Sequence, residues 1–265
     1  MIGIIVALVA LMLGTLMEGG SPAAYANPSA AVIIFGGTFG ATIASFGLAD
    51  FMKFPKLFGI AVKAPKDHRP EMRETLVAFA GRARREGLLA LESDLETVTD
   101  PFLKSGLQMV IDGLEPEVVE EILEIDTEAM QARHAHGAAI FNAMGGYAPT
   151  MGVIGTVMGL VNVLSQLDNP GELGGAIAVA FIATLLGVGS ANIVWLPICQ
   201  SLKNASSHEV AARRMALTGI LAIQAGDNPR IVAQKLDSFV AGAGAGAAAA
   251  ATAQGLAGKT AEGTA

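Results

Sequence analysis

Two threonines stand in long apolar stretches of this sequence, where a hydroxyl group needs a hydrogen-bond partner. Thr156 lies within Tyr147–Val161, a run without a charged side chain, and Thr184 lies in the apolar run that follows. In hydrocarbon, a threonine hydroxyl bonds to its own helix backbone or to a neighbouring helix. Two interpretations are open: ordinary helix packing, or an ion path lined by both hydroxyls.

Small residues surround both threonines at helical spacing. Such residues let two helices approach closely inside a membrane, because no bulky side chain separates the backbones. We therefore expect the two apolar segments to pack tightly while each presents one hydroxyl. The expected packing positions are Gly152, Gly155 and Gly159 near Thr156, and Ala180 and Gly187 near Thr184.

Composition places these segments in a membrane protein. The chain has 265 residues, of which 52% are hydrophobic and 15% charged, and its mean hydropathy is +0.52. It is too apolar for an ordinary soluble domain and carries too many charges to lie wholly in a membrane. We predict an all-α membrane protein with four transmembrane helices and a helical cytoplasmic domain. The four apolar segments are Ile2–Met17, Ser29–Leu48, Met144–Leu167 and Gly175–Leu202.

The positions of the basic residues predict the orientation. Asp50–Phe141 carries eleven Lys or Arg and the stretch from Lys203 carries six, which together account for all seventeen. By the positive-inside rule both termini and the middle region are cytoplasmic. The predicted order is spans 1 and 2 in residues 1–48, a cytoplasmic helical domain in 49–141, spans 3 and 4 in 142–202, cytoplasmic C-terminal helices in 203–240 and a disordered Ala/Gly-rich tail in 241–265.

The stretch Asp50–Lys66 mixes aromatic and basic side chains directly after the second span. This mixture is typical of a segment that lies along the membrane interface, with rings in the apolar boundary and lysines near the headgroups. We predict that it follows the inner leaflet. The residues concerned are Phe51, Phe54 and Phe58, with Lys53, Lys56 and Lys63.

The four predicted spans contain no charged side chain, because the nearest acidic residues fall at their edges. A pump that acts alone would need an ionisable group inside the membrane. Any proton or sodium path therefore needs a charge from another subunit. No nucleophile elbow, phosphate-binding loop or zinc-ligand spacing is present, so we expect no enzyme activity, no bound metal and no cofactor. The net charge of −7 argues against nucleic acid as a partner.

Two prolines lie in the apolar segments, Pro149 at the start of the third span and Pro197 near the end of the fourth. Each removes a backbone donor and can kink or hinge its helix. Kinks without a role are common in membrane helices. The alternative is a hinge that couples ion passage to movement of the cytoplasmic domain.

The run Gly81–Glu96 places basic residues before an apolar turn and acidic residues after it. A solvated surface with local ion pairs explains such a cluster. The sharper hypothesis is a docking patch for a partner of complementary charge, which would speed and orient association. Its candidate residues are Arg84, Arg85 and Glu92.

Several segments together resemble the MotA/PomA stator subunits of the bacterial flagellar motor, over about Met1–Val240. They are ARREGLLALE, YAPTMGVIGTVMGLV, AVAFIATLLG, WLPI and LAIQAGDNPR. The resemblance implies a pentamer of this chain in the bacterial inner membrane, around a dimer of a MotB/PomB-type partner whose single membrane helix carries an essential aspartate. Ion flow past that aspartate would turn the pentamer, and its cytoplasmic charges would push on the rotor protein FliG.

The resemblance also implies roles for single residues. Arg84 and Glu92 correspond to the rotor-contacting charges, with Arg85 as a contributor. Pro149 and Pro197 match two functional prolines, and Thr156 and Thr184 match hydroxyls along the ion route. Sodium-driven members tend to have a second threonine where this chain has Ala183. Protons are therefore expected as the transported ion rather than sodium.

Two alternatives remain at this stage. One is an energising subunit of the ExbB/TolQ type, although its members typically have three spans and this chain begins with two adjacent ones. The other is a passive channel or scaffold that exposes its cytoplasmic domain to an unrelated partner.

Overall fold

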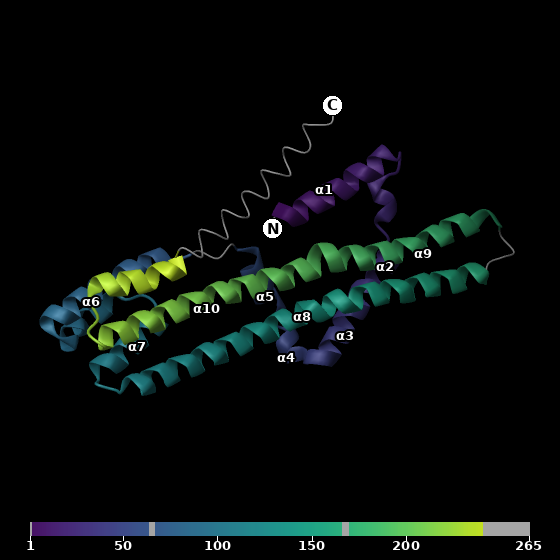
Figure 1. Cartoon of the computed structure of the whole chain (residues 1–265). Helices are drawn as coiled ribbons and strands as arrows, with labels where there is room; N and C mark the ends of the chain where they lie inside the picture. Colours follow the sequence, from purple (N-terminus) through teal and green to yellow (C-terminus); the bar gives the residue numbers. More distant parts are fainter. Residues whose placement is uncertain (1, 64–66, 166–169, 241–265) are drawn as a thin grey trace, which may run out of the picture. The chain divides into compact units, whose positions relative to one another are not determined.

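The computed structural model describes residues 2–63, 67–165 and 170–240. All regular secondary structure within these ranges is helical (Figure 1). The predicted tail, 241–265, lies outside the described residues. The chain forms two compact units, the first made of Met1–Ala64 and Ala132–Ser206 and the second of Pro65–Gln131 and Ser207–Ala265. Each unit is described by itself.

The first unit begins with the apolar helix α1 and a second apolar helix built from three consecutive pieces. Asn27 caps this second helix, because its side chain accepts a hydrogen bond from the Ala30 amide at 3.0 Å. The helix ends at Gly47, whose φ of 82° favours glycine. The elements are α1 (Ile2–Met17), η1 (Pro22–Tyr25), α2 (Pro28–Ala31), the π-helix η2 (Val32–Gly36), α3 (Gly37–Phe46), α4 (Leu48–Phe51) and α5 (Phe54–Val62).

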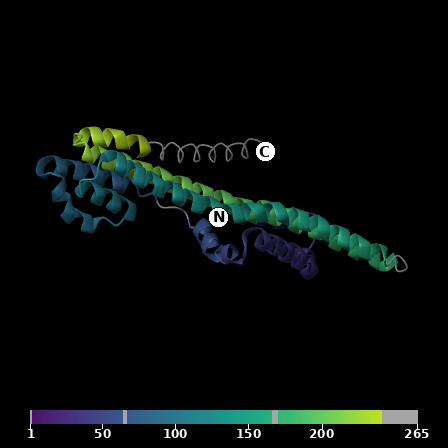
Figure 2. The same cartoon turned by 90° about the horizontal axis from the view of Figure 1, so that it is seen from below.

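Two further apolar segments lie in longer helices than the sequence analysis expected. α8 runs over Pro116–Leu164, and α9 (Pro170–Ser190), the π-helix η4 (Ala191–Trp195) and α10 (Leu196–Gln224) follow one another without a break. α9 lies alongside α8 in both views (Figures 1 and 2). The first of the predicted C-terminal helices in 203–240 is not separate from the fourth apolar segment. α10 continues past Leu202 because no glycine or proline follows there to stop it.

Three helices of the described chain are long and apolar enough to cross a membrane, Pro28–Phe46, Pro116–Leu164 and Ile177–Gln224. The first predicted span corresponds to a shorter apolar helix, Gly3–Met17. The all-helical fold class is therefore confirmed at this level.

Aromatic side chains hold the first unit together around Trp195. Its ring lies 6.1 Å from the rings of both Phe39 and Phe54, measured between centroids. Phe54 also stacks on Phe141 of α8 at 5.2 Å. These contacts fix α5 against α3, α8 and η4.

The second unit packs helices around an aliphatic core. Leu76, Leu91, Leu107 and Ile220 are fully buried there and come from four different helices. Asp100 caps α7 by accepting hydrogen bonds from the amides of Phe102 and Leu103, and Asn228 accepts one from the amide of Arg230. Besides parts of α8 and α10, the elements are α6 (Arg69–Glu86), the 3-10 helix η3 (Leu88–Thr97), α7 (Pro101–Ile111) and a helix over residues 229–240.

Candidate functional site

The structure brings the two predicted threonines together. The Thr156 hydroxyl on α8 is hydrogen-bonded to the Thr184 hydroxyl on α9. Thr156 Oγ1 also lies 3.0 Å from the carbonyl oxygen of Gly152 and 2.9 Å from that of Ala180. Four oxygens thus gather between two apolar helices, and both hydroxyls are only half-buried. Such a group can accept and pass on a proton or contact a small hard cation.

The predicted small residues lie where α8 and α9 touch. A Cβ added to Gly187 would lie 2.6 Å from the carbonyl oxygen of Ala148, and one added to Gly152 would lie 3.0 Å from that of Ala183. At Gly159 an added Cβ would lie 2.8 Å from the Ala180 Cβ. Gly155 is equally close to Ala183, at 2.9 Å between the added and the existing Cβ. The backbones are therefore in direct contact, and this contact positions Thr156 against Thr184.

The two prolines differ in their local structure. Pro149 lies inside α8 and removes the amide that would bond to the Gly145 carbonyl. Pro197 follows the π-helix η4, and its ring would meet the carbonyl of Ile193, which lies within that π-helix. A π-helix widens one turn of the backbone and so gives this ring room. The proline alone indicates that the helix can kink or hinge at Pro197, but nothing in the sequence pattern indicates this widened turn.

The helix segments around the threonine pair carry no charge of their own. Residues 137–164 and 177–202 contain no Asp, Glu, Lys, Arg or His. Within the described ranges, no group of three or more His, Cys, Asp or Glu is placed to hold a metal ion. The chemistry available here is hydrogen bonding by hydroxyl and carbonyl oxygens.

The predicted docking residues lie in the second unit, on both sides of a tight turn. α6 ends at Gly87, whose φ is 86° and whose amide donates to the Ala83 carbonyl at 2.8 Å. Arg84 and Arg85 precede this turn, Glu92 follows it on η3, and all three are exposed. None of the three forms an ion pair with another described residue. Leu89 between them is 72% exposed. The patch therefore presents unpaired charge of both signs around one apolar side chain.

Arg82 connects the two halves of this patch, a role that the sequence pattern does not indicate. Its guanidinium donates to Glu86 Oε2 at 3.1 Å within α6, and to the Asp94 carboxylate on η3. These hydrogen bonds raise the pKa of Arg82, with Glu86 the larger cause. Because Arg82 connects α6 to η3, it is a positioning residue for Arg84 and Glu92.

In the first unit, Asp50 contacts His136 and Lys53, and neither of these contacts was predicted from the sequence. His136 Nε2 on α8 lies 2.9 Å from Asp50 Oδ2 on α4, and Lys53 Nζ donates to Asp50 Oδ1 at 2.7 Å. The hydrogen bond from Lys53 and then that with His136 lower the pKa of Asp50. The available signal was that Asp50 and His136 are the ionisable residues next to the second and third apolar segments.

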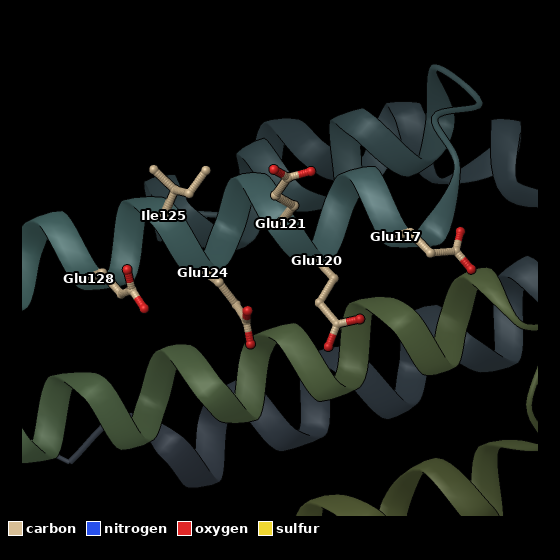
Figure 3. A pocket seen from close by; sticks show the side chains of 6 residues that line it. All are labelled: Glu117, Glu120, Glu121, Glu124, Ile125 and Glu128. Atoms are coloured by element: carbon tan, nitrogen blue, oxygen red, sulfur yellow. The ribbon is translucent and has the colours of Figure 1, made fainter.

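The first turns of α8 carry an acidic surface in the second unit (Figure 3). It borders a cavity of about 400 Å³ whose lining consists of Glu117, Glu120, Glu121, Glu124, Ile125 and Glu128. All six residues come from one helix. Carboxylates spaced three or four residues apart on a helix repel one another. We assign no site to this surface, because its lining offers no second kind of ligand group.

Comparison with known families covers both parts of the chain. Residues 94–215 match the MotA/TolQ/ExbB proton channel family, and residues 1–87 match the Motility protein A N-terminal family. The chain is 44% identical to "Motility protein A" of Bacillus subtilis (strain 168) over 237 residues, 89% of this chain and 88% of the relative. It is 33% identical to "Chemotaxis protein PomA" of Vibrio alginolyticus over 231 residues, 87% of this chain and 90% of that protein.

Solved structures agree with these relatives. "Structure of the flagellar MotAB stator complex from Bacillus subtilis" contains a chain with a TM-score of 0.84 and 44% identity, covering 89% of this chain and 92% of that one. "Structure of C. jejuni MotAB" gives a TM-score of 0.84 at 31% identity, with coverages of 90% and 93%. These values extend the likeness from sequence to fold.

Fold, apolar helices and family matches together define a multi-pass membrane protein of an ion-channel family, and not an enzyme. Within that class, the chain belongs to the MotA/PomA family of flagellar motor stator subunits. The resemblance noted from the sequence motifs is thereby confirmed.

Proposed function

We propose that this stator subunit assembles with a MotB/PomB-type single-span partner whose membrane aspartate supplies the missing charge of the ion path. The observation that carries the proposal is the threonine pair, set between helix segments with no ionisable side chain of their own. An ion path inside a membrane needs an ionisable side chain. The related chains of known structure occur in MotAB complexes, which supports a partner of that kind.

Protons are the proposed ion. The Thr156 and Thr184 hydroxyls and the two adjacent carbonyl oxygens form a short hydrogen-bonded chain from α9 to α8. A hydroxyl can donate and accept at once, so it can pass a proton along such a chain. The matching family is described as a proton channel family, which agrees with this choice.

The exposed charges at Arg84, Arg85 and Glu92 are the proposed contact with the rotor protein FliG. Their lack of ion pairs within the described chain leaves them available to a partner. Leu89, which lies between these charges in the sequence, adds an exposed apolar side chain. Complementary charge would orient the rotor and speed its association more than it would tighten binding.

The membrane arrangement is proposed from length and charge. All four apolar helices cross the inner membrane, with α1 the shortest, and both termini lie in the cytoplasm. Copies of the chain associate as a pentamer around the partner. Pro149 and Pro197 act as the hinges through which ion passage moves the cytoplasmic charges.

The decisive experiment uses swimming cells that lack their own stator. Co-expression of this chain with a single-span partner should restore swimming, while the same partner with its membrane aspartate changed to asparagine should not. Swimming should stop on addition of a protonophore and continue when sodium is removed. Appreciable ion conductance from this chain expressed alone would overturn the proposal in favour of a passive channel.

A further inference from the structure

The outward face of α5 is unlike the rest of the first unit, because it combines exposed apolar side chains with lysines. Residues 51–63 contain three lysines and no acidic residue. Met52 is 70% exposed, Ile60 45% and Val62 43%. Met52 and Lys53 lie in the turn between α4 and α5, Lys56 lies in α5, and Lys63 caps the end of that helix. All four residues are exposed. No ion pair joins Lys56 or Lys63 to another described residue.

The opposite face of α5 fixes its position in the unit. A Cβ at Gly137 of α8 would lie 3.1 Å from Leu57 Cδ2, and Phe54 stacks on Phe141 of the same helix. On α10, the Ser201 hydroxyl donates to the Ala61 carbonyl at 2.9 Å. The lysine-bearing face therefore points away from α8 and α10.

These contacts place α5 at the level where the apolar helices end. On α8, His136 is the last ionisable side chain before the apolar segment, and the α5 contact begins at the next residue, Gly137. On α10, Lys203 is the first charged residue after the apolar segment and lies two positions beyond Ser201. α5 thus lies at the boundary between the apolar core of the membrane and water.

Charge complementarity identifies what covers this face. Asp50, the acidic residue that precedes this segment, accepts from Lys53 and contacts His136. No ion pair within the described chain compensates Lys56 or Lys63. A soluble anion would neutralise these lysines but would leave Met52, Ile60 and Val62 exposed. A phospholipid with a net negative headgroup meets both needs, because its phosphate contacts ammonium groups while its acyl chains cover apolar side chains.

We propose that the outward face of α4 and α5, centred on Lys56 and Lys63, is a binding site for anionic phospholipid in the adjacent leaflet. The site continues the apolar surface of Pro28–Phe46, since only Gly47 separates that span from α4. Lysine stems lie along the apolar surface and their ammonium groups reach the headgroup phosphate. The proposal goes beyond torque generation and needs only that the chain is inserted in a membrane.

The single tryptophan of the chain allows a direct test. Trp195 is buried, and its ring centroid lies 6.1 Å from that of Phe54 on the inward face of α5. A lipid bound at the lysines therefore lies across one helix from this ring, a distance of roughly 10 Å. The purified full-length chain is reconstituted in phosphatidylcholine vesicles, and brominated phosphatidylglycerol or brominated phosphatidylcholine is added as the quencher. Wild-type Trp195 should be quenched at a lower fraction of phosphatidylglycerol than of phosphatidylcholine, and added salt should reduce the difference.

Two variants separate charge from fold. Lys56→Gln with Lys63→Gln should lower the preference for phosphatidylglycerol by about fivefold for each lysine removed. Lys56→Arg with Lys63→Arg should keep it, as should the distant control Lys104→Gln on α7. Equal quenching of the wild type by both lipids, or a preference that survives the double glutamine change, would overturn the proposal. Neither result bears on ion flux or swimming, so the stator function is tested separately.

Discussion

The hydroxyl of Thr156 on α8 is hydrogen-bonded to the hydroxyl of Thr184 on α9. Within such a pair one hydroxyl donates and the other accepts. Thr156 Oγ1 also has the carbonyl oxygens of Gly152 and Ala180 within 3.0 Å, one on each helix. If Thr184 donates, the Thr156 proton is left to bond to either carbonyl. Thr156 therefore has an acceptor for its own proton on each of the two helices while it accepts from Thr184.

Removing the hydroxyl of Thr156 or Thr184 should reduce the rate of proton transport. We expect Thr156→Ala or Thr184→Ala to reduce proton flux at least about fivefold, since one hydrogen bond contributes about 1 kcal/mol. Thr156→Ser should retain most of the flux because it keeps the hydroxyl. Thr150→Ala is the matched control, since that hydroxyl bonds to the Tyr147 carbonyl of its own helix at 2.7 Å. Unchanged flux in Thr156→Ala, measured in vesicles containing the partner, would leave only the packing interpretation.

Backbone contact between α8 and α9 makes Gly187 sensitive to a single methyl group. Gly187→Ala would place Cβ 2.6 Å from the Ala148 carbonyl oxygen, so one helix must shift. We expect a loss of about 1 to 3 kcal/mol in unfolding free energy, as for other overpacked sites. Gly189→Ala is the control, because nothing lies within 4 Å of its added Cβ. Thermal unfolding in detergent compares the two, and equal melting temperatures would show that the contact yields without cost.

Local pattern was enough to predict the apolar helices and the close packing of two of them, each carrying one threonine hydroxyl. The apolar runs, the four-residue spacing of Ala180 and Thr184, and the caps at Asp100 and Asn228 are all visible along the chain. Each depends on residues a few positions apart. The charged run that contains Arg84 and Glu92 also predicted the docking patch. No sequence pattern indicated that these two residues would form no ion pair with other described residues.

Contacts between distant segments were not predictable in this way. Asp50 and His136 meet although 86 positions separate them, and Arg82 reaches Asp94 across the Gly87 turn. The π-helix before Pro197 depends on how a proline ring is accommodated by its surroundings. Tertiary packing determines such features. The periodicity of side chains along one segment does not show which distant residues will come into contact.

Charge reversal in the docking patch should weaken swimming without unfolding the protein. Arg84 and Glu92 are exposed and form no ion pair with described residues, so Arg84→Glu or Glu92→Lys should change stability by less than about 0.5 kcal/mol. Swimming speed should fall and recover in part when the opposing rotor charge is reversed. Glu96→Lys, an exposed change at the end of η3, is the control. Full swimming with both charges removed would contradict a rotor contact.

Restoring the missing amides should stiffen the proline-containing helices. Pro197→Ala restores a backbone amide beside the widened turn of η4, and Pro149→Ala restores one that can bond to the Gly145 carbonyl. Assembly with the partner should be retained while torque, measured on tethered cells, falls. Pro229→Ala is the matched control, because proline in the first turn of a helix removes no internal hydrogen bond. Normal torque from both altered helices would mean that the prolines shape the helices without hinging them.

Asp67 should make the second unit sensitive to acid. The side-chain hydrogen bond from the buried Arg69, Nε to Oδ1 at 2.8 Å, is the main cause that lowers the pKa of Asp67 below its ordinary value of 3.8. A carboxyl group whose pKa is lower in the folded state than in the unfolded chain stabilises the fold. This contribution is fully present at pH values above the pKa of the unfolded chain, and it is lost as the pH falls through the pKa of the folded state. We therefore expect wild-type stability to decline below about pH 3.8 more steeply than that of Asp67→Asn.

The variant should be less stable at neutral pH, because Arg69 then keeps only the Phe239 carbonyl, at 3.1 Å, as a strong acceptor. Glu74→Gln, a change of an exposed residue on α6, should leave the decline of stability at low pH unaltered. Circular dichroism during acid titration compares the three proteins, and parallel curves for wild type and Asp67→Asn would show that the pair does not link folding to pH.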